Sequence, residues 1–392
     1  MATTLLPEVM RGDPETEVTH DVLCLRTGIV NLFLWGPPGA GDREWVLVDA
    51  GLYGSAERIL RAAEERFGPG ARPAAIILTH GHFDHVGALP ALADLWDAPI
   101  YAHPLEVPYL TGRSAYPPPD PTVGGGAMAR LSPLYPRGPY DFTGWLDVLP
   151  ADGSVPGMPG WRWIHTPGHT PGHVALFREA DRLLIAGDAF VTTKQESLWA
   201  VLEQRPEIHG PPAYYTIDWD AARRSVELLA LLEPAIAATG HGPPLRGEAM
   251  TAGLRLLARD FEMLAVPDDG RYVRAPAITD ETGVVSVPPA VHDNLPLLLA
   301  LGGALALGAV VGGIALRSRE PGPRIRIDER DLERYPEGDG GVLEYDVRSD
   351  RLVEYDLHGG AHVEYDGEEE GGYDDDEVEV EYVVEGYDEL RY

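Results

Sequence analysis

The 392-residue sequence has very little cysteine: Cys24 is the only one. An intrachain disulfide is therefore impossible, which excludes a disulfide-stabilised scaffold but does not fix the cellular compartment. A lone cysteine is more often a small buried hydrophobic side chain than a nucleophile. The N-terminal stretch MATTLLPEVMRGDPETEV has no basic segment followed by an apolar one, so we expect no secretory signal.

Positive charge is scarce as well. The chain has 31 Lys and Arg residues against 63 Asp and Glu residues, a formal net charge of -32. Residues 317–392 hold 26 of the acidic and 9 of the basic side chains, so more than half of the excess lies in less than a fifth of the chain. Nothing in the remainder indicates a basic groove, which argues against nucleic acid and in favour of a small-molecule substrate.

Residues 1–264 are predicted to form a mixed α/β domain. Apolar runs typical of strands alternate with stretches typical of helices, and this order favours sheets covered by helices. The strand-like runs are 30–36, 44–51, 74–80, 161–168, 173–177, 182–190 and 235–242, and the helix-like stretches are 54–67, 86–95, 221–232 and 247–264. Residues 104–160 are rich in Pro and Gly, and long loops of this kind are often lids or binding loops.

Residues 265–294 are predicted to be an extended appendage or linker, and residues 295–316 a transmembrane helix. The stretch 297–316, LLLALGGALALGAVVGGIAL, contains only Leu, Ala, Gly, Val and Ile. A helix of twenty such residues spans about 30 Å, the thickness of the bilayer hydrocarbon. The alternative is a buried helix of a soluble protein. Ala304, Gly308 and Gly312 lie on one face of this helix, where small residues allow close approach of a second copy and hence a homodimer.

The acidic residues 317–392 are predicted to be a disordered tail, because like charge and few apolar groups oppose a packed core. Within it LEYDV, VEYDL and VEYDG recur with a ten-residue period, at 343–347, 353–357 and 363–367. The alternative is a repeat that binds a partner or a cation.

The charges beside the apolar segment give conflicting indications of topology. Four arginines follow it within residues 317–326, which places the tail in the cytoplasm by the positive-inside rule. That topology exports the large N-terminal domain, although no signal is visible. We therefore expect a cytoplasmic catalytic domain held at the membrane by a single C-terminal anchor.

Residues 79–87, THGHFDHVG, follow an apolar run and bring four potential metal ligands into six positions. Alternate side chains of an extended segment point the same way, so His80 and His82 can bind one ion together. After a turn at Phe83, Asp84 and His85 can reach a second position.

Three later segments each place a ligand-type residue in a turn after an apolar run. TPGHTPGH supplies His169 and His173, AGDAF supplies Asp188, and TGHGP supplies His241. Functional sites are commonly built from loops held at strand ends by a rigid scaffold. The four segments together predict a metal site.

These ordered motifs resemble those of the metallo-β-lactamase superfamily, from about residue 18 to residue 264. The resemblance implies an αββα sandwich with the site at one edge of two facing sheets. It also implies that Asp49, in LVDAG, and His173 support the site without touching a metal; ordinary hydrogen-bonded turn residues are the alternative. The implied ligands are His80, His82 and His169 for one metal, Asp84, His85 and His241 for the other, and Asp188 as the bridge between them.

This ligand set suits two Zn²⁺ ions per chain, with iron or manganese as alternatives. A bridging carboxylate such as Asp188 offsets the repulsion between two close ions. A water between the ions becomes a hydroxide nucleophile, and the ions polarise the substrate carbonyl. Asp84 is the catalytic candidate, because it can orient the hydroxide or accept its proton. We therefore expect a metal-dependent hydrolase.

The substrate is less defined, and a thioester, a lactone or a similar small ester is expected. Asp188 stands where β-lactamases of classes B1 and B2 have cysteine, which disfavours β-lactam hydrolysis of that type. Thioesterases resembling glyoxalase II share all seven ligand types; Lys194 is a candidate for the basic contact they need, with an exposed surface lysine as the alternative. Quorum-quenching lactonases have tyrosine where this chain has Val191, and Tyr214 or Tyr215 are candidates to replace it.

Two other classes of function stay open. Persulfide dioxygenases of the same superfamily keep these motifs but use one iron and oxygen. A membrane-anchored scaffold that binds partners through its acidic tail is the non-catalytic alternative.

Overall fold

The computed structural model describes residues 15–197, 199–200 and 204–291, and the backbone of three strands between residues 341 and 365. The chain divides into two compact units, Met1–Gly313 and Ile314–Tyr392, and each is described by itself.

A seven-stranded sheet comes first in the chain, and its strands lie in sequence order from β1 to β7. The pairs from β1 to β4 are antiparallel, whereas β4 to β7 are parallel neighbours joined by crossover segments. Parallel strands end at the same edge of a sheet, so the segments that follow β4 and β5 emerge together. The strands are β1 (Glu15–Thr19), β2 (Val22–Thr27), β3 (Val30–Trp35), β4 (Val46–Val48), β5 (Ala75–Ile77), β6 (Ile100–Ala102) and β7 (Leu146–Val148).

The second sheet has five strands in the order β12-β11-β10-β9-β8. Strands β10 and β11 are parallel and the other neighbours are antiparallel. The strands are β8 (Trp161–His165), β9 (Val174–Arg178), β10 (Leu183–Gly187), β11 (Ile236–Thr239) and β12 (Leu245–Arg246).

The alternation of side chains along the strands explains how the layers stack. In β3, Leu34 belongs to a buried cluster with Ile59 of helix α1 (Ala56–Phe67), whereas Phe33 belongs to a second cluster with Leu176 of β9. The first sheet therefore packs helices α1 and α3 (Leu89–Trp96) on one face and the second sheet on the other.

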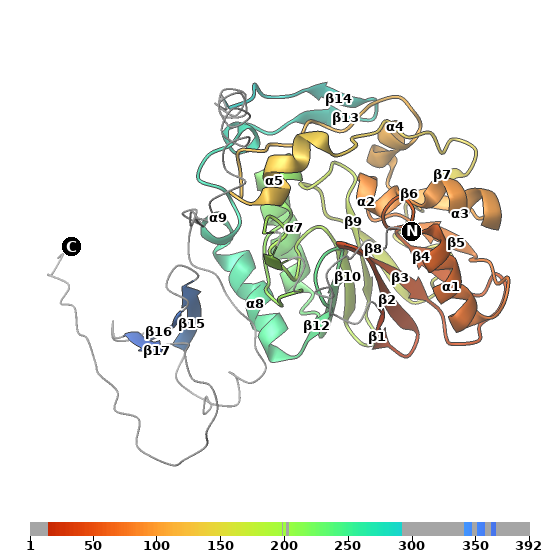
Figure 1. Ribbon diagram of the computed structural model, residues 1–392, viewed down its shortest axis with the longest axis horizontal. Helices are drawn as coiled ribbons and strands as arrows, with labels where there is room; N and C mark the ends of the chain where they lie inside the picture. Colours follow the sequence, from red (N-terminus) through yellow and green to blue (C-terminus); the bar gives the residue numbers. More distant parts are fainter. Residues whose placement is uncertain are drawn as a thin grey trace, which may run out of the picture. The chain divides into compact units, whose positions relative to one another are not determined.

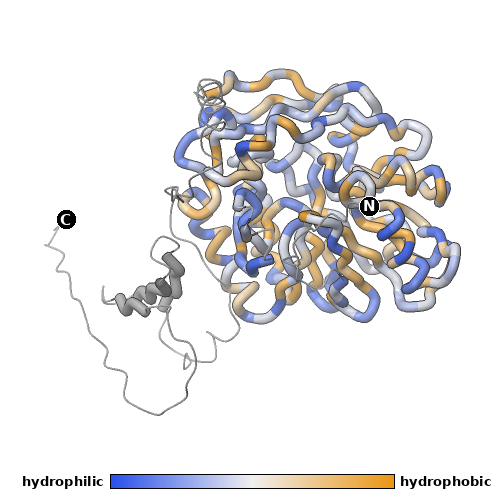
Figure 2. The backbone as a smooth tube through the Cα atoms, in the orientation of Figure 1, coloured by the Kyte–Doolittle hydropathy of each residue, from blue (hydrophilic) through white to orange (hydrophobic). Residues whose placement is uncertain are grey.

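The opposite face of the second sheet is buried too. Ala175 and Phe177 of β9 are at most 1% exposed although they point away from the cluster between the sheets. Helices α7 (Trp219–Leu231) and α8 (Glu248–Arg259) lie on this side (Figure 1). Figure 2 shows how hydrophobic and hydrophilic residues alternate along these helices, as expected for elements with one buried face. The predicted αββα sandwich is confirmed.

The Pro- and Gly-rich residues 104–160 form a largely irregular excursion, as predicted, with short helical turns. These turns are η1 (Pro104–Glu106), α4 (Val107–Leu110), α5 (Ala127–Leu131) and η2 (Ser132–Leu134). Other short elements are α2 (Phe83–Val86), η3 (Ala213–Tyr215) and α9 (Phe261–Leu264).

Residues 265–291 form an appendage that packs against this excursion. It contains α10 (Arg271–Arg274) and a hairpin of β13 (Ile278–Asp280) and β14 (Gly283–Ser286). The Arg271 backbone N–H donates to Asp120 (2.6 Å), and the hydroxyl of Tyr272 donates to the Pro118 carbonyl (2.5 Å). Tyr272 is only 3% exposed. The segment is therefore docked on the domain and is not a free linker over these residues.

The predicted transmembrane helix, residues 295–316, lies outside the described residues. Among the helices that the structure does describe, none is long and apolar enough to cross a membrane.

The second unit contains a three-stranded antiparallel sheet, β15 (Gly341–Asp346), β16 (Arg351–Asp356) and β17 (His362–Tyr365). These strands differ from the disorder predicted for residues 317–392. Each one overlaps a Glu-Tyr-Asp repeat, where Val and Tyr, residues enriched in strands, recur at the ten-residue period. The remaining tail residues lie outside the described part of the chain.

Candidate metal centre

The ligand candidates meet because their loops leave the two sheets at one edge. His80 and His82 follow β5, whereas Asp84 and His85 lie in the short helix α2. His169 lies between β8 and β9. Because β10 and β11 are parallel, Asp188 and His241, which follow them, also reach a common edge. All seven predicted ligands are at most 6% exposed.

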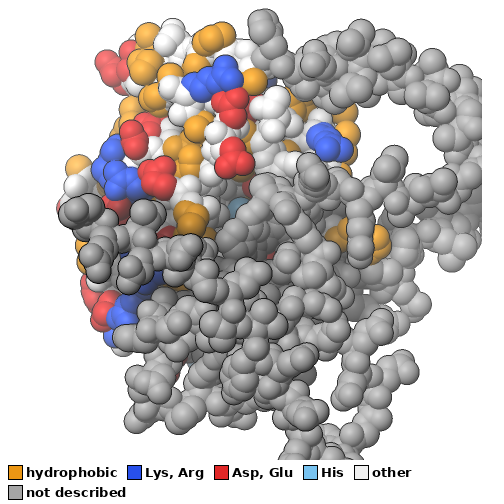
Figure 3. Space-filling model, turned by 90° about the vertical axis from the view of Figure 1, so that its left-hand side faces the viewer, with side chains coloured by type: hydrophobic (Ala, Val, Ile, Leu, Met, Phe, Trp, Pro, Cys, Tyr) orange, Lys and Arg blue, Asp and Glu red, His pale blue; other side chains and the backbone are white. Residues whose placement is uncertain are grey.

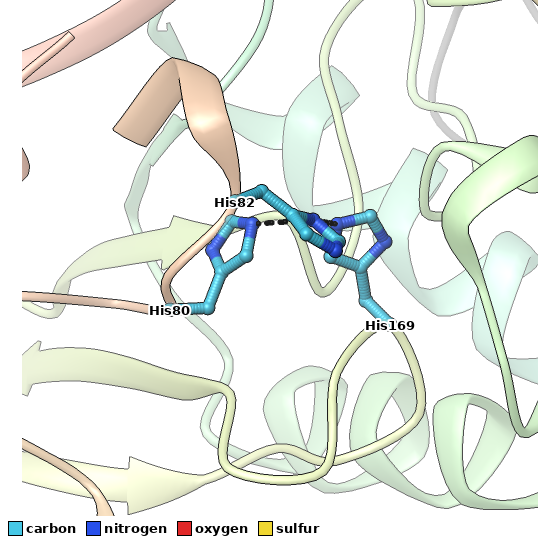
Figure 4. Close-up of side chains that lie close together, drawn as sticks. All are labelled: His80, His82 and His169. Atoms are coloured by element: carbon cyan, nitrogen blue, oxygen red, sulfur yellow. Dashed lines mark hydrogen bonds between the residues drawn. The ribbon is translucent and has the colours of Figure 1, made fainter. Parts of the chain in front are cut away.

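Three imidazoles form the first group. The Nδ1 atom of His82 lies 3.1 Å from Nε2 of His80 and 3.0 Å from Nε2 of His169 (Figure 4). These three nitrogens could hold one ion, as the sequence predicts.

The second group consists of Asp84, His85 and His241. Nε2 of His241 lies 3.5 Å from Oδ2 of Asp84. Asp188 lies between the two groups: its Oδ1 is 3.6 Å from Nε2 of His85, and its Oδ2 is 3.1 Å from Nε2 of His241 and 3.5 Å from Nε2 of His169. The Asp188 carboxylate thus lies within reach of donors of both groups.

The donor set fits divalent metal ions. Donors bound tetrahedrally at about 2.0–2.1 Å lie roughly 3.4 Å from one another, close to the separations found here. Nε2 of His85 and Oδ1 of Asp188 are buried without a hydrogen-bond partner. A buried polar atom without a partner is costly, and a shared ion removes that cost.

The neutral state of two of the imidazoles also suits metal binding. Burial, followed by the neighbouring imidazoles, holds the pKa values of His80 and His82 well below the usual range, so both rings are neutral and offer a lone pair. Burial lowers the pKa of His85 too, but the carboxylates of Asp188 and Asp49 outweigh it and raise this pKa well above the usual range. Burial alone raises the pKa of Asp188, yet His241 and His85 hold it well below the usual value.

Asp49 orients His85 from behind. Its Oδ2 accepts hydrogen bonds from Nδ1 of His85 (2.8 Å) and from Oγ1 of Thr79 (2.7 Å), and its Oδ1 accepts from the Thr79 N–H (2.8 Å). With Nδ1 engaged, Nε2 of His85 is left to face the centre. Asp49 has a φ of 61°, a left-handed conformation that is uncommon for a residue other than glycine.

Both ring nitrogens of His173 contact groups other than the candidate ligand atoms. Its Nδ1 lies 2.8 Å from Oγ1 of Thr166, and its Nε2 accepts a hydrogen bond from the Asp188 N–H (2.8 Å). It thereby fixes the backbone of Asp188. Asp49 and His173 both lie where the resemblance implies, in contact with ligand residues.

Further contacts of this kind escape sequence reasoning. Nδ1 of His241 lies 2.7 Å from the Ile29 carbonyl, which fixes the ring so that Nε2 faces the centre. Thr79 could be inferred only from its position beside His80, and the Ile29 carbonyl gives no sequence signal at all.

The three candidates for substrate contact are all buried. Tyr215 is 5% exposed, its ring lies 4.4 Å from the His82 ring between centroids, and its hydroxyl has no hydrogen-bond partner among the described residues. Tyr214 packs beside it, with ring centroids 5.1 Å apart. Lys194, the only lysine in the chain, is 5% exposed, so the expectation of an exposed surface lysine is wrong. Val191 is also buried.

An aromatic wall, of which the sequence predicted only Tyr214 and Tyr215, stands beside the ligand groups. We define it as Phe83, Tyr135, Tyr140, Tyr214 and Tyr215, from three separate segments. The Tyr135 ring lies 5.3 Å from Phe83 and 6.4 Å from Tyr215 between centroids. After burial, the charge of Asp84 is the largest cause that raises the pKa of Tyr135, Tyr140, Tyr214 and Tyr215. Figure 3 shows one face of the described part of the molecule, where histidine surface is visible among hydrophobic and charged side chains.

The αββα sandwich places the candidate metal ligands of both sheets at one edge. Comparison of the sequence with family models identifies the class of protein that has this arrangement. Residues 27–241 match the family model of the metallo-beta-lactamase superfamily, and the chain belongs to this superfamily.

Individual relatives give a finer comparison. The chain is 47% identical over 249 residues to "Probable metallo-hydrolase YflN" of Bacillus subtilis (strain 168), which covers 64% of this chain and 94% of the relative. It is 29% identical over 202 residues to "Probable metallo-hydrolase YybB" of the same organism, covering 52% of this chain and 77% of the relative. Among solved structures it is similar to the metallo-beta-lactamase family protein TTHA1429 from Thermus thermophilus, with 26% identity and a TM-score of 0.39 over 62% of this chain and 77% of that one.

Proposed function

We propose that this protein is a hydrolase that binds two divalent metal ions, zinc in the first instance, and cleaves a small ester, lactone or thioester. The observation that supports it most is the complete set of seven buried donors in two groups, with the Asp188 carboxylate between them. The similarity to relatives described as metallo-hydrolases supports the same reaction class.

His80, His82 and His169 would hold one ion, Asp84, His85 and His241 the other, and Asp188 both. Ions in such a site lower the pKa of a bound water toward neutrality and polarise the carbonyl of the substrate. In this proposal the Asp84 carboxylate orients the attacking water and accepts its proton.

The aromatic wall would bind the substrate. Burial, and then the Asp84 charge, raises the pKa of Tyr215 well above neutrality, so its hydroxyl remains protonated and can donate a hydrogen bond. The hydroxyls of Tyr215 and Tyr140 are both buried without partners. We propose that Tyr215 donates to the ester oxygen of the substrate. It would thereby replace the tyrosine that lactonases have at the position of Val191. The rings favour an apolar acyl group.

Metal analysis of purified protein, combined with a panel of esters, lactones and thioesters, tests this function. We expect about two metal ions per chain and hydrolysis of at least one substrate class. The variant His82→Ala should bind less metal and lose the hydrolytic activity. Fewer than one ion per chain, or activity that His82→Ala leaves intact, contradicts the proposal. One iron per chain with oxygen uptake on a persulfide would support the dioxygenase alternative instead.

We also retain the proposal that residues 295–316 anchor the catalytic domain at the membrane, with the domain in the cytoplasm. The sequence of that segment supports it, as it does the proposals of a homodimer and of a partner-binding tail. Protease accessibility of the tail in intact cells tests the topology. A cytoplasmic domain with a single span places the tail outside, so cleavage from outside is expected and a protected tail would contradict the proposal.

A further inference from the structure

Glu106 is a buried carboxylate that belongs to neither ligand group. It ends η1, directly after β6, and its exposed fraction is 0%. Four donors surround it. Its Oε2 accepts hydrogen bonds from the Gly81 N–H (3.0 Å) and from the Tyr116 hydroxyl, and its Oε1 accepts from Oγ1 of Thr170 (2.8 Å) and the Gly172 N–H (2.8 Å).

Three of these donors lie on the two loops that carry the three imidazoles of the first group. Gly81 stands between His80 and His82, in the loop after β5 of the first sheet. Thr170 follows His169 directly, in the loop between β8 and β9 of the second sheet. One carboxylate therefore joins a ligand loop of one sheet to a ligand loop of the other.

Tyr116 completes the connection. It is 1% exposed, its hydroxyl accepts the Gly81 N–H (3.0 Å) as it donates to Glu106, and its ring lies 4.7 Å from the His82 ring between centroids. The same residue thus fixes the backbone beside His82 and packs against its imidazole.

This arrangement explains two glycines of the sequence motifs. A Cβ atom at Gly81 would lie 2.4 Å from the Tyr116 hydroxyl, and one at Gly172 would lie 2.7 Å from Cγ of Glu106. Neither glycine has a positive φ, so conformational freedom is not the reason for them. The space that a side chain would need is taken by Glu106 and Tyr116.

Each oxygen of Glu106 faces one backbone N–H that cannot rotate away. A glutamine in its place would therefore put its NH₂ group against a backbone N–H in either orientation of the amide, so that at least one of the four hydrogen bonds to this side chain is lost. The position requires a carboxylate, not merely a polar side chain of this size.

We propose that Glu106, together with Tyr116, is a positioning residue that sets the spacing of the two loops and so holds His80, His82 and His169 around one metal ion. Its action is on metal binding and does not depend on the substrate. It rests on the proposed function only through the presence of a metal, so an error in the substrate class would leave it intact.

Metal titration of Glu106→Gln tests the proposal, using Zn²⁺ against a chelator and the visible spectrum of the Co²⁺-loaded protein. We expect one of the two metal equivalents to bind about 10- to 100-fold more weakly, the range found when partners of metal ligands are removed. The Co²⁺ spectrum of that equivalent should change. Excess metal should restore kcat, with KM unchanged.

Asp120→Asn is the matched control. Asp120 is also buried (3% exposed) and accepts from backbone N–H groups on both oxygens, those of Thr122 (3.0 Å) and Arg271 (2.6 Å), but it joins the excursion to the appendage and no ligand loop. We expect it to lower the melting temperature and leave both metal affinities unchanged.

Equal weakening of both equivalents in Glu106→Gln, unchanged affinities in that variant, or the same loss in Asp120→Asn would each overturn the proposal. If Glu106→Gln does not fold, Tyr116→Phe keeps it testable, because it removes one of the four donors. A smaller loss confined to one equivalent supports the proposal, and unchanged metal binding contradicts it.

Discussion

At the scale of single residues, Tyr215 has the clearest position for a substrate contact. Its ring lies against His82, a predicted ligand, and its hydroxyl is buried without a partner. An unpaired buried hydroxyl is unfavourable in the free protein, so a substrate oxygen that accepts its hydrogen bond gains from that deficit.

Replacement Tyr215→Phe should lower kcat, because it removes one donor to the developing negative charge while the ring remains. Losses of about 100-fold are typical for such donors. Steady-state kinetics and metal analysis would measure the effect, with the metal content unchanged. Tyr109→Phe is the control, because the Tyr109 hydroxyl is equally buried and unpartnered but the ring lies outside the aromatic wall. Equal activities in the two variants would refute the role of Tyr215.

A second residue-scale consequence concerns pH. His103 and His165 stack with centroids 4.1 Å apart and an interplanar angle of 11°. Burial, and then the charge of His165, lowers the pKa of His103 to about 4. The unfolded chain therefore takes up a proton on this ring at higher pH than the folded chain, and stability falls as pH drops from about 6.5 toward 4.

His103→Asn should reduce this loss, since asparagine can still accept the Leu105 N–H that now donates to Nδ1 of His103 (3.2 Å). Melting temperatures of the metal-free proteins between pH 4 and pH 8 would show a shallower acid slope for the variant. Melting-temperature curves that run parallel for the variant and the wild type would show that protonation of His103 does not cause the acid loss of stability.

The ligands could be read from the sequence because each occupies a short motif beside Gly or Pro at the end of an apolar run. Their supporting contacts could not. Glu106 lies 25 positions from Gly81 and 66 from Gly172, and only the completed fold shows that its carboxylate meets both.

At the scale of elements, apolar runs and helix-like stretches predicted most strands of the two sheets and the long helices that cover them, because a buried segment is recognisable from its own residues. The appendage was not predicted in its docked form. Its order comes from contacts such as Tyr272 with Pro118 and Val284 with Ser114, which join positions more than 150 residues apart. Such contacts leave no periodic signal in a segment this short.

Tyr272→Ala should therefore destabilise the domain, by about 3 kcal/mol, as for other buried aromatic side chains replaced by alanine. Urea denaturation would measure the difference in unfolding free energy. Met263→Ala in α9, at a side chain that is 66% exposed, is the matched control and should change it by less than about 0.5 kcal/mol. An effect of Tyr272→Ala no larger than the control would show that the appendage does not contribute to the fold.

At the scale of the whole domain, both sheets supply ligands to one centre. A metal that binds only the folded chain raises its stability by mass action, by about 2.7 kcal/mol per site at a free concentration 100 times Kd. Removal of metal with a chelator should lower the melting temperature of the wild type, and the loss should be smaller in His82→Ala. Scanning calorimetry with and without chelator would test this, and an unchanged wild-type transition would argue against a folded-state metal site.

The burial of Lys194 gives the protein a built-in reporter of local opening. Because the chain has no other lysine, an amine-reactive label has one side-chain target, and it lies six residues beyond Asp188 in the sequence. Modification of this residue in the folded state should be slow and limited by transient opening of the segment that carries it. The labelling rate, followed by peptide mass spectrometry, would measure how often this segment opens to solvent and whether a bound substrate suppresses that motion.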